Sequence, residues 1–66
     1  MNTASIDRDL IIGQILDCMS ALNILREQNN ETQFNLINNI KVLDVMDDEE
    51  LMLTHTNFVE LVALCF

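Results

Sequence analysis

The chain has 66 residues, half of them hydrophobic, and its eleven acidic side chains against three basic ones give a net charge of -8. Disordered acidic segments are poor in hydrophobic residues, because they cannot bury enough surface to offset chain entropy. The composition therefore excludes a disordered tail and predicts a folded acidic domain. It also argues against direct nucleic-acid binding, since phosphates are neutralised by clustered Lys and Arg, whereas Arg8, Arg26 and Lys41 are far apart in the sequence.

A chain of this length forms a single helical domain, residues 1–66, with a small core. Such cores rarely supply more than about 3–5 kcal/mol without a disulfide, a metal or a partner subunit. Cys18 and Cys65 are expected to be buried reduced thiols, although a bridge between them stays open. No His or Cys cluster has metal-ligand spacing, so we predict no metal and no cofactor. A homodimer is then the expected source of extra burial.

The sequence shows neither a leader peptide nor a membrane span. No basic region precedes a hydrophobic run near the N-terminus. No uninterrupted hydrophobic stretch approaches the ~20 residues that a span needs. We therefore expect a cytoplasmic protein without membrane insertion.

Hydrophobic residues in the first half of the chain recur in alternating steps of four and three, the spacing of a helix seam. The seam consists of Ile11, Ile15, Cys18, Leu22 and Leu25. It predicts a helix over residues 6–27, with Ser5 or Asp7 as its N-cap. Gly13 inside this helix marks either a close helix crossing or a tolerated defect that costs about 1 kcal/mol.

A second, shorter helix is predicted after the polar break at Gln28-Asn29-Asn30. Asn30 and Gln33 fit a capping box, in which the amide of Gln33 reaches back to the cap N–H. The following hydrophobic residues, among them Phe34, Ile37 and Ile40, have helical spacing. We place this helix at residues 31–44.

A third helix is predicted over residues 48–65, preceded by four consecutive carboxylates. Asp47 and Glu50 fit a second capping box. Asp48 and Glu49 lie between them, point outward and are predicted to form a partner-facing acidic patch. The fold class is thus all-α, three helices that assemble into a helical homodimer.

The predicted dimer interface combines the seam of the first helix with the hydrophobic face of the third. An isologous dimer places the same patch on both subunits, so seam residues would meet their own copies. The expected interface residues are Ile11, Ile15, Cys18, Leu22, Leu25, Phe58, Leu61, Val62 and Cys65.

Nothing in the sequence indicates a catalytic site. His55 is the sole histidine, and no spacing places a cysteine or serine beside it. Its simplest role is structural, on the seam of the third helix. A pH-sensing role is the alternative, because histidine changes charge near physiological pH.

The layout resembles the small enterobacterial two-component-system connector proteins, the AriR/YmgB and YcgZ group. The resemblance covers roughly residues 9–66 and rests on Leu10-Ile11-Ile12 leading into Gly13-Gln14, the break at Asn29-Asn30, and His55-Thr56-Asn57 before a hydrophobic tail. Leu36-Ile37 and Asp48-Glu49-Glu50 also fit. The resemblance implies a helical homodimer without enzymatic activity. Such proteins modulate a sensor-kinase phosphorelay that controls biofilm formation and acid resistance.

We therefore expect a non-enzymatic regulatory protein that acts by protein–protein interaction. Its partners would be itself and a regulatory protein such as a sensor kinase. The alternative is an acidic inhibitor or DNA mimic that blocks a basic nucleic-acid-binding protein, which fits the charge sign. Mimics usually spread carboxylates along a surface, whereas four of the eleven here are consecutive.

Overall fold

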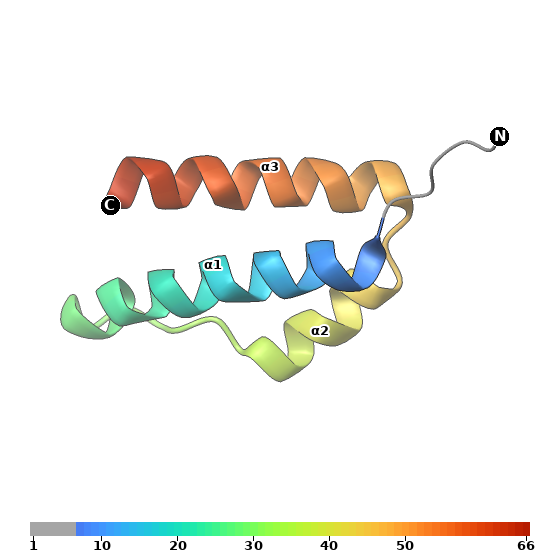
Figure 1. Cartoon of the computed structure of the whole chain (residues 1–66). Helices are drawn as coiled ribbons and strands as arrows, with labels where there is room; N and C mark the ends of the chain where they lie inside the picture. The colour runs from blue at the N-terminus through green and yellow to red at the C-terminus, as the bar shows by residue number, and fades with distance from the viewer. Residues whose placement is uncertain (1–6) are drawn as a thin grey trace, which may run out of the picture.

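A computed structural model describes residues 7–66, and the secondary structure of this part is entirely helical. Helix α1 is Arg8–Gln28, α2 is Leu36–Asp44 and α3 is Asp48–Cys65 (Figure 1). The predicted all-α fold with three helices is confirmed. Ser5, one of the two expected caps, and residue 6 of the predicted first helix lie outside the described residues.

Helix α1 lies between the other two helices, with α3 on one side and α2 on the other (Figure 1). The helices α1 and α3 are parallel, because the chain returns along α2 before α3 begins. Contacts are made mainly between α1 and α3 and between α1 and α2. The starts of α1 and α3 therefore share one end of the molecule with the end of α2.

The core is small and joins all three helices. Ile15 and Met19 of α1 pack with Leu43 of α2 and Leu51 of α3, and each of the four is at most 2% exposed. Leu22 is the fifth buried hydrophobic residue. Ile11 and Phe58 are half-buried against this core.

The two predicted seams pair with each other inside one chain. The seam of α1 is matched on α3 by residues 51, 55, 58, 62 and 65, which are forty positions further along. Arg8 bonds to Asp48 and Gln14 to His55, so the parallel helices stand in this register. The predicted dimer interface is therefore wrong at Ile15 and Leu22, which are buried against their own chain. Periodicity identified the seam but could not distinguish a partner within the chain from one in another subunit.

Helix α2 begins five residues later than the predicted residue 31, and Asn30 has a different role. Asn30 has φ of 57°, the left-handed conformation that ends helices. The Glu31 N–H donates to the Arg26 carbonyl at 2.7 Å and the Asn30 N–H to the Glu27 carbonyl at 3.2 Å, a Schellman pattern that closes α1. The capping box of Asn30 and Gln33 is thus wrong. Asn35 is the N-cap of α2, and its side chain accepts from the Asn38 N–H.

The other two N-caps agree with the sequence pattern. The Asp7 side chain accepts from the Leu10 N–H at the start of α1. The Asp47 carboxylate accepts from the Glu50 N–H at 2.8 Å at the start of α3. Each carboxylate satisfies an N–H that has no partner within its helix.

Residues 29–35 connect α1 to α2 in an extended path that is fastened to α1. The Asn23 side chain makes two bonds to the backbone of Phe34: its amide donates to the carbonyl, and its oxygen accepts from the N–H at 2.6 Å. The Phe34 ring stacks edge-on against Phe58, with centroids 5.7 Å apart, and lies beneath the Arg26 guanidinium. These contacts tie the connection to both long helices.

The structure differs from two expectations, a close helix crossing at Gly13 and the burial of both cysteines. A Cβ built on Gly13 would have no atom within 4 Å, so this glycine does not mark a close helix crossing. Cys18 and Cys65 are both free thiols, and Cys65 is exposed rather than buried.

Candidate interaction surfaces

The described part of the chain carries two exposed surfaces of contrasting chemistry, one acidic and one hydrophobic. The first, which we call the acidic end, lies where α1 and α3 begin and α2 ends. It holds seven of the eleven carboxylates: Asp7, Asp9, Asp44, Asp47, Asp48, Glu49 and Glu50. All seven are exposed.

Helix dipoles explain why carboxylates gather there. Each helix start carries a partial positive charge, and the parallel arrangement brings two starts together. Asp9 lies in the first turn of α1, and Asp48, Glu49 and Glu50 lie in the first turn of α3. Carboxylates at these positions offset the unfavourable alignment of two parallel dipoles. The acidic end therefore has a structural role besides any contact with a partner.

Arg8 joins the three helix ends at the acidic end. Its guanidinium donates to the Met46 carbonyl at 2.6 Å and, at 3.3–3.4 Å, to the carbonyls of Asp44 and Leu43. It also donates to Asp48 Oδ1 at 2.7 Å. One cation thus caps the end of α2 and binds the first residue of α3.

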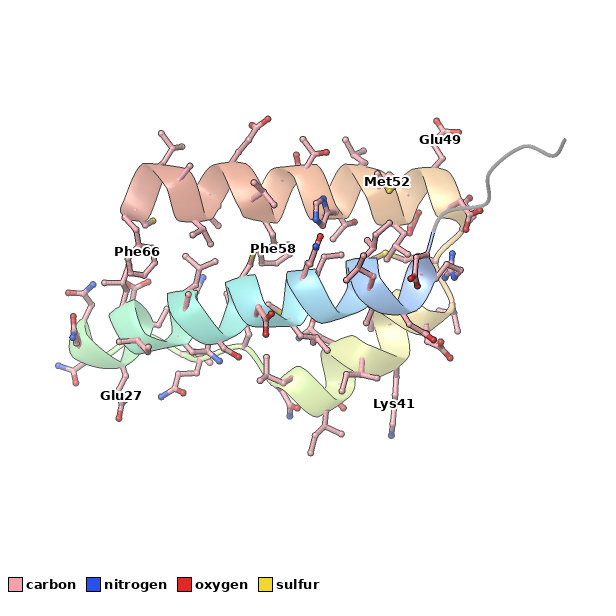
Figure 2. All side chains as sticks on the ribbon, in the orientation of Figure 1. Glu27, Lys41, Glu49, Met52, Phe58 and Phe66 are labelled. Atoms are coloured by element: carbon pink, nitrogen blue, oxygen red, sulfur yellow. The ribbon has the colours of Figure 1, made fainter. Side chains whose placement is uncertain are left out.

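The Arg8 bond changes the predicted roles of Asp48 and Glu49. Asp48 is engaged with Arg8, although its side chain stays 61% exposed. One of its two carboxylate oxygens is therefore held within the chain. Glu49 extends from the first turn of α3 away from the other two helices (Figure 2). Asp48 and Glu49 are both exposed, so the partner-facing patch stays a prediction, with other members of the acidic end beside it.

Arg26 is also occupied within the chain. Its guanidinium lies 4.4 Å from the centre of the Phe34 ring and donates to the Thr32 carbonyl. A Glu31 oxygen lies 4.0 Å away. Lys41 makes no ion pair within residues 7–66 and extends from α2 into solvent (Figure 2). The charge offered to a partner is therefore almost entirely negative.

The second surface follows one flank of α3. We call it the α3 stripe: Met52, Thr56, Val59, Ala63 and Phe66. Steps of four, three, four and three place these residues on one face of the helix. All five are exposed, with Val59 at 45% and Phe66 at 69%, and none has a charged side chain.

Contacts on either side of α3 show which flank the α3 stripe occupies. Thr54 contacts the sulfur of Met46 and Phe58 contacts Phe34, so one flank faces α2 and the connection before it. His55 lies toward the opposite flank and bonds to Gln14 of α1 through Nε2 at 2.7 Å. Met52, Val59 and Phe66 follow the His55 flank by helical spacing. The α3 stripe therefore lies on the side of the α1–α3 pair that α2 leaves open.

The hydrophobic residues that remain exposed outnumber those in the core. Twelve large hydrophobic side chains of the described residues are exposed, whereas five are buried. Among the former, Val45 is 83% exposed and Leu64 is 85% exposed. Of the other predicted interface residues, Ile11, Cys18, Leu25, Phe58 and Val62 are half-buried, and Leu61 and Cys65 are exposed.

A shallow recess separates the far ends of α1 and α3. Leu22 and Leu25 line it from α1, and Leu61 and Cys65 line it from α3. Arg26 and Glu31 lie at its edge. Its walls are hydrophobic, and the one arginine beside it is already bonded to Thr32.

Residues 7–66 contain no group of three or more His, Cys, Asp or Glu side chains that could hold a metal ion. In the same part of the chain, no helix is both long enough and hydrophobic enough to cross a membrane. His55, the one candidate for proton transfer or pH sensing, is half-buried and bonded to the neutral Gln14 side chain. The structure thus places His55 in a contact between α1 and α3.

Comparison of the chain with protein-family models, with curated proteins and with solved structures found no match. The resemblance to connector proteins therefore stays a prediction.

Proposed function

We propose that this protein is a small, non-enzymatic regulatory protein that acts as a homodimer by binding another protein. The main support is the way charge is distributed. Two of its three basic residues are bonded within the chain, and seven of its eleven carboxylates lie at one end. That end suits a partner surface rich in Lys and Arg, because complementary charge steers association and excludes wrong partners.

The resemblance to connector proteins suggests what the partner is. A sensor kinase of a phosphorelay that controls biofilm formation and acid resistance would be bound through a basic patch, and its activity would change on occupancy. The acidic end supports a docking role, since it combines fixed helix starts with carboxylates such as Glu49 and Asp9 that extend into solvent. The alternative, a DNA mimic, is less well supported, because the carboxylates gather at one end instead of following an extended surface.

A capture experiment with matched charge reversals tests the proposal. The immobilised protein is exposed to cell lysate, and bound proteins are identified by mass spectrometry. One variant reverses two charges at the acidic end, Asp44→Lys with Glu49→Lys. The control, Glu27→Lys with Glu60→Lys, makes the same change in net charge elsewhere on the surface.

The specific partner should be retained by the wild type and by the control, and lost with the acidic-end variant. A captured histidine kinase supports a connector, whereas a repressor or nuclease supports the mimic. Equal loss with both variants would show that net charge alone drives binding and would contradict a defined docking end. Purified partner should also bind more weakly as salt rises, because exposed charges are screened.

A further inference from the structure

We infer that the α3 stripe pairs with the α3 stripe of a second copy in antiparallel orientation, with Val59 at the two-fold axis. This inference rests on the proposed homodimer and states which surface forms it. It replaces the predicted interface on α1, whose central residues Ile15 and Leu22 are buried within the chain. The α3 stripe has the heptad spacing of a two-helix seam and no covering element among residues 7–66.

The order of residues along the α3 stripe suits pairing with itself. In an isologous contact, a residue at one distance from the axis meets a residue at the same distance on the other side. Met52 and Phe66 lie seven positions before and after Val59. Antiparallel pairing therefore places Met52 against Phe66 of the partner subunit and Val59 against Val59 of the partner subunit. Thr56 lies three positions before Val59 and Ala63 four positions after it, so these two small residues come within about 1.5 Å of the same level along the helix axes.

Charge selects both the surface and the orientation. Two chains of net charge -8 repel each other, so contact between them is favoured where carboxylates are fewest. The side chains of the α3 stripe are uncharged, and Glu60 lies at its edge, three and four positions from Ala63 and Thr56. In the neighbouring row of Leu53, Asn57, Glu60 and Leu64, the same carboxylate lies within the seam. Parallel pairing would also bring together the two groups of Asp47, Asp48, Glu49 and Glu50. Antiparallel pairing puts these groups at opposite ends and aligns the helix dipoles favourably.

Single-cysteine cross-linking tests the surface and the orientation together. The background replaces the native thiols by Cys18→Ala and Cys65→Ser, and its dimer is first checked by sedimentation equilibrium. Into it are placed Val59→Cys, Met52→Cys, Phe66→Cys or, on the opposite face, Leu64→Cys. These positions are exposed, so each variant should keep its helical circular dichroism. A disulfide forms only where the two Cα atoms are within about 7 Å.

Val59→Cys should form a covalent dimer on mild oxidation, about tenfold more than Leu64→Cys, because the dimer holds the two thiols at high effective concentration. Met52→Cys alone should not cross-link, but a mixture of Met52→Cys and Phe66→Cys should. Cross-linking of Met52→Cys with itself would show a parallel seam and overturn the inference. A dimer in which Val59→Cys does not cross-link would overturn it while leaving the homodimer standing. A monomeric background protein with a monomeric wild type would overturn both.

Discussion

Arg8 shows how much of this small fold depends on one side chain. Its guanidinium reaches carbonyls at the end of α2, the Met46 carbonyl in the turn and the Asp48 carboxylate of α3. Planar guanidinium groups can serve several acceptors at once, whereas the ammonium of lysine is a compact point charge. Arg8 therefore holds the three helix ends in the arrangement that creates the acidic end.

Arg8→Ala should lower the free energy of unfolding by about 1–3 kcal/mol, since it removes several bonds to a charged donor. Arg8→Lys keeps the charge but not the geometry and should recover only part of the loss. Lys41→Ala is the matched control, because Lys41 makes no ion pair within the described residues. Urea denaturation of the three variants measures the differences. Equal stability of Arg8→Ala and Lys41→Ala would show that Arg8 does not join the helix ends.

A substitution at Gly13 is expected to raise the stability of the fold. It lies inside α1, where glycine costs conformational entropy, and an added Cβ meets nothing within 4 Å. Gly13→Ala should therefore raise the free energy of unfolding by about 0.5–1 kcal/mol. Thermal or urea denaturation measures the gain. A loss of stability would mean that something packs closely over this position, as a helix crossing would require.

At the scale of the elements, local signals predicted the helices well but not their partners. Asp7 and Asp47 are N-caps, as their position before hydrophobic periodicity indicated. The prediction of Asn30 as an N-cap was wrong because asparagine suits both an N-cap and the left-handed residue that ends a helix. Which role it takes depends on the Schellman bonds and on Asn23 binding Phe34, a contact that no local pattern reveals.

Two alanine substitutions, one of Asn35 and one of Gln33, test where α2 begins. Asn35→Ala should cost about 0.5–2 kcal/mol of stability, because the Asn38 N–H loses its acceptor. Gln33→Ala should change stability little, since Gln33 precedes the helix and is exposed. Chemical denaturation of both variants distinguishes the two positions. The reverse order of effects would restore a helix that starts near residue 31.

The interaction surfaces were only partly predictable for the same reason. The run of carboxylates at the start of α3 can be recognised in the sequence. Asp7, Asp9 and Asp44 lie at the same end of the molecule only because α1 and α3 pack in parallel. The engagement of Asp48 by Arg8 joins residues forty positions apart. Helical spacing alone does not distinguish the α3 stripe, because its exposure depends on which face of α3 packs against α1 and so leaves Met52, Val59 and Phe66 exposed.

At the scale of the whole molecule, the acidic end and the α3 stripe are proposed to have separate roles. In the proposed assembly, the acidic end repels other copies and suits a basic partner, while the uncharged side chains of the α3 stripe let two copies approach. An antiparallel dimer would place one acidic end at each extremity, so that each dimer offers two docking ends. Two docking ends would increase the apparent affinity for a dimeric partner whose basic patches match their spacing.

Sedimentation equilibrium at micromolar concentration tests most directly whether the α3 stripe assembles the protein. The wild type should sediment at about 15 kDa, twice the 7.6 kDa of one chain, as a two-fold dimer requires. Leu64→Glu, on the other face of α3, should stay dimeric, whereas Val59→Glu should sediment as a 7.6 kDa monomer that keeps its helical circular dichroism. A wild type that sediments at 7.6 kDa, or a Val59→Glu variant that remains dimeric, would contradict assembly through this surface.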